Sequence, residues 1–179
     1  MMPRFLFCLV ALLLVSESIS AADLTDRSSV PSPDKQFAVV FSDRRTFTVQ
    51  DARGAAVVSS RDLPRFRDVA EFRPEHVSWS PDSQILAVAG GGGHDLETFI
   101  LVRRRNSFFP ITVPNLTDRY DNPFVTPAKW LKGRRLVLDI SGPHAGKANG
   151  YYYKGRATIR VSITPPACEV LYNQITEHK

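Results

Sequence analysis

Residues 77–89 read VSWSPDSQILAVA, which combines a short extended lead, a Ser-Pro-Asp turn and a run of apolar residues. Proline sets φ for the second position of a type I turn, and the aspartate that follows can hydrogen-bond the nearby backbone. The run at residues 85–89 is short and apolar, which is typical of a buried strand. The stretch therefore predicts two strands joined by a tight turn.

The same arrangement occurs on either side of this stretch. Residues 30–41 read VPSPDKQFAVVF, and residues 128–140 read AKWLKGRRLVLDI. The two Ser-Pro-Asp turns are 48 residues apart, and in the third copy Lys132 and Gly133 replace Pro-Asp. Glycine tolerates the positive φ that a tight hairpin needs. A period of this size indicates a repeat architecture, here with three units.

Further strand-like segments follow each copy. They alternate or are continuously apolar, and they lie at residues 46–50, 98–102 and 157–163 and then at residues 55–58, 111–113 and 169–172. Thirteen prolines and regularly spaced turn residues separate such segments, which is typical of an all-β chain. We therefore predict an all-β protein of three repeated antiparallel sheet units, at about residues 28–75, 76–125 and 126–175.

These residues also carry a family resemblance. The pattern W-S-P-D-x-x-x-[L/I]-A-[V/F] in residues 77–89, with the second strand TFILV at residues 98–102, resembles the blade repeat of TolB-like and WD40-like β-propellers. The first copy keeps Ser-Pro-Asp without the tryptophan, and the third keeps the tryptophan without Ser-Pro-Asp. The resemblance implies four-stranded blades and a binding or scaffolding role, since this repeat carries no catalytic signature. The resemblance does not identify a ligand.

The number of units is small for such a fold. Closed propellers have about 4–8 blades, and three blades cannot enclose a central channel. We therefore expect an incomplete propeller, a ring that further chains complete, or three sheets packed as an open, layered domain.

Residues 1–22 resemble an export signal. Arg4 precedes an apolar run at residues 5–15, and the mostly small or polar residues 16–22 offer a cleavage site. The run is shorter than the roughly 20 residues that span a bilayer, although a retained anchor is the alternative. We predict a secreted or periplasmic protein in which residues 23–179 form a single β-repeat domain that is not an integral membrane protein. Cleavage would leave Cys168 as the only cysteine.

The loops between the first and second strand of each unit are the candidate ligand site, because equivalent loops of a repeat share one face. The second loop reads GGGGHDL at residues 90–96, and the third reads SGPHAGKANGYYYKG at residues 141–155. The candidate ligand-binding residues in these loops are His94, Asp95, His144, Lys147, Tyr151 and Tyr153.

Each candidate has a structural alternative. His94, Asp95 and His144 offer two imidazoles and a carboxylate to a metal, or they are solvated groups on a surface turn. The tyrosines offer aromatic faces to a sugar or peptide, or they begin a strand in which Tyr152 faces away from its neighbours. The glycines fail the phosphate-loop pattern, and we expect no cofactor.

The charge is basic but dispersed. Arginine supplies 17 of the 23 positive residues, and the net charge is +5. The arginine clusters lie among acidic residues, which favours a solvated surface over a binding patch. Contact with an anionic envelope polymer is the functional alternative, and export argues against nucleic acid.

The sequence contains no G-x-S-x-G, H-E-x-x-H or C-x-x-C motif. It therefore favours an exported, non-enzymatic binding or scaffold module whose partner is another protein or a second copy of itself. Two alternatives stay open. One is an extracytoplasmic enzyme or metal-binding protein that uses the loops around His94 and His144, and the other is a structural envelope component.

Overall fold

The computed structural model describes residues 28–118, 120, 122–143 and 152–178, and every structural statement below concerns these residues. They form three four-stranded antiparallel sheets, and they contain no α-helix. The first sheet contains β1 (Ser29–Pro31), β2 (Phe37–Asp43), β3 (Thr46–Asp51) and β4 (Ala56–Ser59). The second contains β5 (Glu71–Trp79), β6 (Ile85–Gly91), β7 (Glu97–Arg104) and β8 (Ser107–Ile111). The third contains β9 (Phe124–Leu131), β10 (Arg135–Pro143), β11 (Tyr152–Ile163) and β12 (Pro166–His178).

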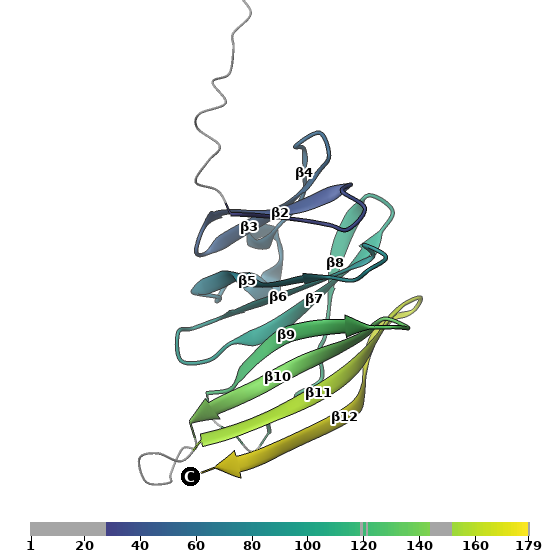
Figure 1. The fold of residues 1–179 in the computed structure, drawn as a ribbon. Helices are drawn as coiled ribbons and strands as arrows, with labels where there is room; N and C mark the ends of the chain where they lie inside the picture. The colour runs from purple at the N-terminus through teal and green to yellow at the C-terminus, as the bar shows by residue number, and fades with distance from the viewer. Residues whose placement is uncertain (1–27, 119, 121, 144–151, 179) are drawn as a thin grey trace, which may run out of the picture.

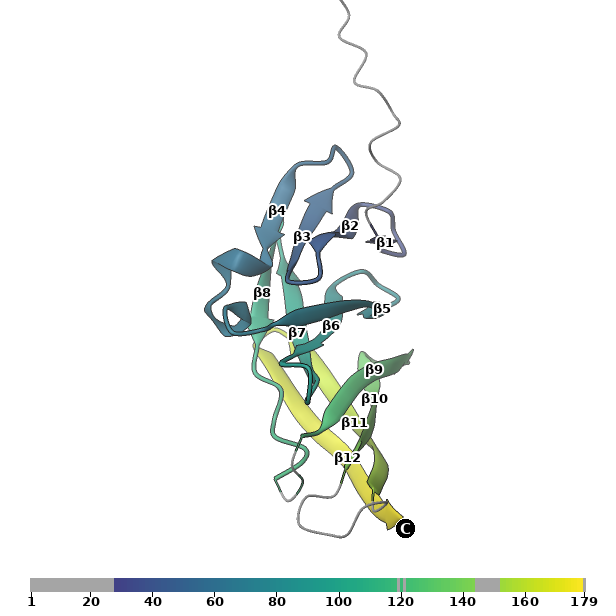
Figure 2. The same ribbon diagram turned by 90° about the vertical axis from the view of Figure 1, so that its left-hand side faces the viewer.

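The sheets follow one another along the molecule as an open stack (Figure 1). Within each sheet the strands lie side by side in chain order, so every sheet is a simple meander. The first and third sheets lie at opposite ends, and they do not meet to close a ring (Figures 1 and 2). The predicted all-β fold of three antiparallel units is confirmed, and their open arrangement is consistent with an incomplete propeller.

Two hydrophobic cores hold the stack together, one on each face of the second sheet. Alternate residues of a strand point to opposite faces. In β6 the side chains on both faces are buried, each set in a different core. Leu86 and Val88 pack with Phe37 and Phe47 of the first sheet, while Ile85 and Ala87 pack in the core shared with the third sheet. This two-sided burial explains why residues 85–89 are continuously apolar.

The two Ser-Pro-Asp turns form the same hydrogen bonds. In the first turn the Ser32 hydroxyl donates to Asp34 Oδ1 at 2.6 Å and accepts from the Phe37 amide at 3.1 Å. In the second turn the Ser80 hydroxyl donates to Asp82 Oδ1 at 2.7 Å and accepts from the Ile85 amide at 2.9 Å. The serine therefore closes the turn that the proline begins.

All three turns place a residue at a positive φ. Lys35 and Ser83 have φ of 57° and 56°, and the equivalent Arg134 of the third unit has φ of 55°. Gly133, which precedes Arg134, has φ of 72°. The third unit thus makes a tighter hairpin with two consecutive positive-φ residues, in which Leu131 is opposite Arg135, whereas the Ser80 amide bonds the Ile85 carbonyl in the second unit.

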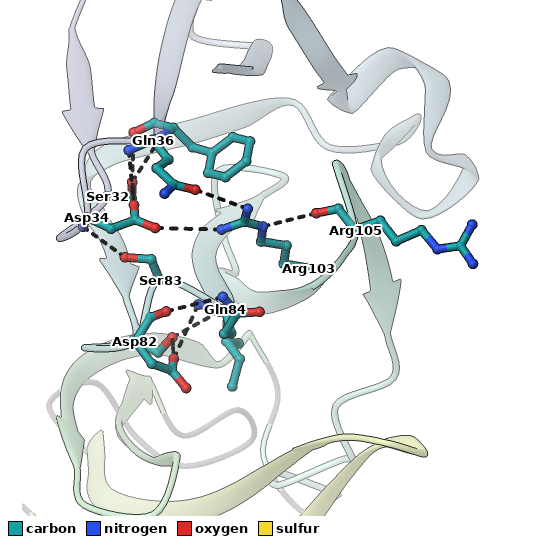
Figure 3. Close-up of polar contacts among 11 residues, drawn as sticks. Ser32, Asp34, Gln36, Asp82, Ser83, Gln84, Arg103 and Arg105 are labelled. Atoms are coloured by element: carbon teal, nitrogen blue, oxygen red, sulfur yellow. Dashed lines mark hydrogen bonds and ion pairs between the residues drawn. The ribbon is translucent and has the colours of Figure 1, made fainter. Parts of the chain in front are cut away.

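A polar clasp joins the first turn to the second sheet (Figure 3). The Asp34 amide donates to the Ser83 hydroxyl at 3.0 Å. Arg103, at the end of β7, lies 3.6 Å from an oxygen of Asp34 and donates to Gln36 Oε1 at 3.1 Å. Its guanidinium also lies 4.4 Å from the centre of the Phe37 ring. At the next junction Arg134 Nε donates to Asp82 Oδ2 at 2.8 Å, so the third sheet is clasped to the second.

Some boundaries differ from the expectation. Strands β5 and β9 begin at Glu71 and Phe124, so the predicted unit boundaries at residues 76 and 126 fall inside strands. The predicted strand at residues 111–113 overlaps β8 only at Ile111, because β8 begins at Ser107, directly after the hairpin turn at Arg105 and Asn106. The predicted signal at residues 1–22 lies outside the described residues. Among those described, no helix is long and apolar enough to cross a membrane.

Candidate binding surface on the third sheet

The glycine-rich loop at residues 90–96 is held by contacts of its own. The Gly92 amide donates to Asp95 Oδ1 at 3.0 Å, and the Leu96 amide donates to the Pro123 carbonyl at 2.8 Å. A Cβ on Gly91 would lie 1.9 Å from the Asp95 carbonyl oxygen, so this position has no room for a side chain. Glycine therefore permits the loop to fold back on itself, and His94 lies exposed at its tip.

The other candidates in these loops are placed differently. His144, Lys147 and Tyr151 lie outside the described residues. Among the residues described, no group of three or more His, Cys, Asp or Glu side chains could hold a metal ion. The metal site of His94, Asp95 and His144 therefore stays a prediction.

Tyr153 points into the protein. Its side chain is fully buried, and its ring centre lies 4.3 Å from that of Tyr120 in the core between the second and third sheets. Tyr152, the next residue along the strand, is exposed. This is the alternative in which Tyr152 faces away from its neighbour, and it places the accessible aromatic ring on the outer face of the third sheet.

The register of β11 and β12 assembles that outer face. Directly opposite residues of an antiparallel pair lie on the same face of the sheet. Tyr152 is opposite His178, Lys154 is opposite Thr176, and Arg156 is opposite Gln174. The next outward pair along β11 joins Thr158 to Tyr172. These side chains therefore form one continuous surface, which we call the outer face.

A shallow groove of about 650 Å³ runs across the outer face. Three strands line it, with Asp139 and Ser141 from β10, Lys154 and Arg156 from β11, and Tyr172, Gln174, Thr176 and His178 from β12. The lining mixes aromatic rings with hydrogen-bond donors and acceptors, as binding sites for polar ligands do.

The charged groups of the groove are partly paired. Arg156 Nε donates to Asp139 Oδ1 at 2.7 Å, and this hydrogen bond raises the pKa of the Arg156 guanidinium. The Lys154 ammonium lies 5.3 Å from the centre of the Tyr152 ring, which in turn stacks on the His178 ring at 5.3 Å. The pairing orients the side chains and leaves the positive charge of Lys154 available on the surface.

Exposed apolar side chains concentrate on the third sheet, although Val170 is opposite the buried Ile159 and so lies on the other face of the sheet. Four of the five exposed large hydrophobic residues in the described chain belong to the third sheet, and these are Tyr152, Val170, Leu171 and Tyr172. Tyr172 has half of its surface exposed, at 50%. Scattered exposed apolar residues are normal in proteins, but a cluster of them marks an interaction site.

Cys168 does not provide a reactive thiolate at the outer face. The residue is half-buried, and burial raises the pKa of its thiol to about 11. At neutral pH it is therefore protonated, whereas thiolate is the reactive form of cysteine.

The β12 residues of the groove are absent from the sequence-based candidates. Residues 169–172 were expected to form a short strand, whereas β12 continues to His178. The polar residues Gln174, Thr176 and His178 recur at every second position, and this period of two is the signal that marks one face of a strand. Tyr172 begins the same series.

Comparison with known proteins places this chain in no family. No family model matches the sequence, and no curated protein matches it.

Proposed function

We propose that the protein is an exported, non-enzymatic binding module that holds its ligand in the groove on the outer face of the third sheet. The observation that carries this proposal is the exposed ring of Tyr172 in a groove lined by polar groups. The predicted export signal supports an exported protein, and the resemblance to TolB-like repeats implies a binding or scaffolding role.

The chemistry of the groove favours a glycan chain of the cell envelope. Sugar rings present apolar C–H faces that pack on aromatic rings, and their hydroxyls bond to side chains such as Gln174 and Thr176. Tyr172, with 50% of its surface exposed, supplies an aromatic face within the groove, and Tyr152 is an exposed ring beside it that stacks on His178. Lys154 adds a positive charge, which suits a glycan that carries carboxylates.

Binding of purified envelope polysaccharide to residues 23–179 tests this proposal. Tyr172→Ala should weaken binding about tenfold, which corresponds to about 1.4 kcal/mol. The matched control is Phe109→Ala, because Phe109 of β8 is an equally exposed ring, at 48%, on another sheet. Equal losses in the two variants, or no loss in Tyr172→Ala, would contradict the proposed surface.

A second candidate function is self-association through the edge of β12. This strand has 13 residues and ends the third sheet, so its outer edge is unpaired among the described residues. Exposed Val170 and Leu171 lie along it. Such an edge is a template for adding a strand from another chain, here a second copy.

The mass of the native protein tests self-association. We expect sedimentation of residues 23–179 to show a concentration-dependent dimer, and we expect Leu171→Lys to shift the protein to the monomer because charge on an edge opposes strand pairing. A wild-type protein that stays monomeric at high concentration would exclude this route.

A further inference from the structure

A second pocket lies at the other end of the stack, beside the first sheet. The connection from β4 to β5 contains two short 3-10 turns, η2 (Ser60–Asp62) and η3 (Pro64–Phe66), and it folds against the start of β3. The pocket encloses about 510 Å³ between this connection and the β2–β3 turn. It shares no residue with the groove on the third sheet.

The pocket has a fixed floor. Phe66 is 3% exposed, and its ring lies 5.7 Å from those of Phe47 and Phe72 and 4.6 Å from that of Phe99, measured between centres. These contacts place the connection firmly in the core shared by the first two sheets. The groups that line the pocket are therefore held by the fold itself.

Two buried hydroxyl groups form one wall. Ser60 is 2% exposed and Thr46 is 6% exposed. The Ser60 oxygen accepts from the Phe47 amide at 3.2 Å, and the Thr46 hydroxyl oxygen accepts from Arg61 Nε at 3.2 Å. Each hydroxyl can also donate one proton. Both hydroxyl groups line the pocket, so each can donate its proton to a ligand bound there.

The rim of the pocket is strongly basic. Arg45, Arg61 and Arg67 line it, and Asp68 is the one acidic residue that does so among the residues described. Arg61 also lies 3.9 Å from Asp43, a long contact between exposed groups that leaves most of its donors free. The fold thus brings Arg45 beside two arginines that follow it by 16 and 22 residues.

We propose that this pocket binds a phosphate group. Three guanidinium groups and two hydroxyl donors match the several acceptor oxygens of a phosphate, and arginine forms strong charge-assisted hydrogen bonds to such oxyanions. The phosphate oxygens can accept the hydroxyl protons of Ser60 and Thr46. It is carried either by a small soluble molecule or by a phospholipid headgroup.

Titration with inorganic phosphate, followed by the amide NMR shifts of residues 23–179, tests the pocket. Saturable shifts should concentrate at residues 45–46 and 60–70. Arg45→Gln combined with Arg67→Gln should weaken phosphate binding at least tenfold, because it removes two of the three guanidinium groups. Arg104→Gln combined with Arg105→Gln is the control, since it removes the same charge from the β7–β8 turn, which lies outside the pocket.

Thr46→Val tests the hydroxyl wall separately. The change removes a donor at a buried position, and we expect phosphate binding to weaken several-fold while the thermal unfolding midpoint stays within a few degrees of wild type. Arg45 and Arg67 are exposed, so the arginine variants report on the pocket even if Thr46→Val perturbs the fold.

A vesicle-binding experiment distinguishes a phospholipid headgroup from a soluble phosphate. Sedimentation with phosphatidylglycerol vesicles that depends on Arg45 and Arg67 would indicate a lipid headgroup, and phosphate binding without vesicle binding would indicate a soluble phosphate. Equal weakening in the two double variants would show that net charge alone attracts the anion. That result, or shifts that do not saturate, would overturn the proposal.

Discussion

At the scale of single residues, Trp79 and Trp130 occupy equivalent positions of the repeat but differ in one hydrogen bond. The Trp79 indole N–H donates to the Val30 carbonyl at 3.1 Å, and its ring packs edge-on against Phe108. The indole N–H of Trp130 is buried and has no partner in the described part of the chain. One indole thus joins two sheets, while the other carries an unsatisfied donor.

This difference predicts that the same substitution costs more stability at Trp79 than at Trp130. Trp79→Phe should lower the free energy of unfolding by about 1–2 kcal/mol more than Trp130→Phe, because only the former removes a hydrogen bond and leaves a carbonyl without its donor. Urea denaturation of both variants measures the difference.

Trp79→Ala should lower the free energy of unfolding by about 3–5 kcal/mol, as expected for a core tryptophan. A loss within experimental error would show that Trp79 does not contribute to the core.

At the scale of elements, the turns between strands do more than reverse the chain. Asp34 closes its own turn through Ser32 and also meets Arg103 from the next sheet. Burial would raise the pKa of the Asp34 carboxyl, but hydrogen bonds from Ser32, Gln36 and Ser83 and the charge of Arg103 outweigh it and lower the pKa. The ionised form is therefore the one that the folded state stabilises.

A pH dependence of stability follows from this lowered pKa. A carboxyl whose pKa is lower in the folded state stabilises the protein above its unfolded pKa of about 3.9, and that contribution is lost as the pH falls through the folded pKa. Asp34→Asn should therefore reduce the unfolding free energy at pH 7, and the difference from wild type should shrink below about pH 3–4. Denaturant titrations at pH 7, 5 and 3 measure it. The exposed Glu97→Gln is the charge-matched control, and an equal effect there would contradict the assignment.

At the scale of the whole molecule, the second sheet belongs to two cores at once. Leu86 packs toward the first sheet and Ile85 packs toward the third, so neither end sheet has a core of its own. The three sheets should therefore unfold together although the stack is open.

Substitutions in either core test this coupling. Val49→Ala lies in the core shared with the first sheet, and Leu138→Ala lies in the core shared with the third. Each should lower the midpoint of one common transition, which circular dichroism and tryptophan fluorescence should report at the same denaturant concentration. Two separate transitions would show that the end sheets fold independently.

Much of the fold is predictable because its signals are local. Strand identity at residues 85–89 follows from an apolar run, and the turns follow from Ser-Pro-Asp and from Lys132-Gly133. The candidate site was harder to predict. The groove depends on which β12 residue is opposite each β11 residue, and the bulge between Thr158 and Ile159 shifts that register. A one-residue shift moves every side chain of a strand to the other face, and sequence spacing does not reveal it.

The amino-acid sequence by itself determined the three units, their meander of strands and their turns, because turn chemistry and the period of two act between near neighbours in the chain. Only the tertiary structure decided that Tyr153 enters the core while Tyr152 remains outside, and that Arg45 meets Arg61 and Arg67 around one pocket. These placements depend on the packing of segments that are distant in sequence, and that packing is set by the two cores on either side of the second sheet.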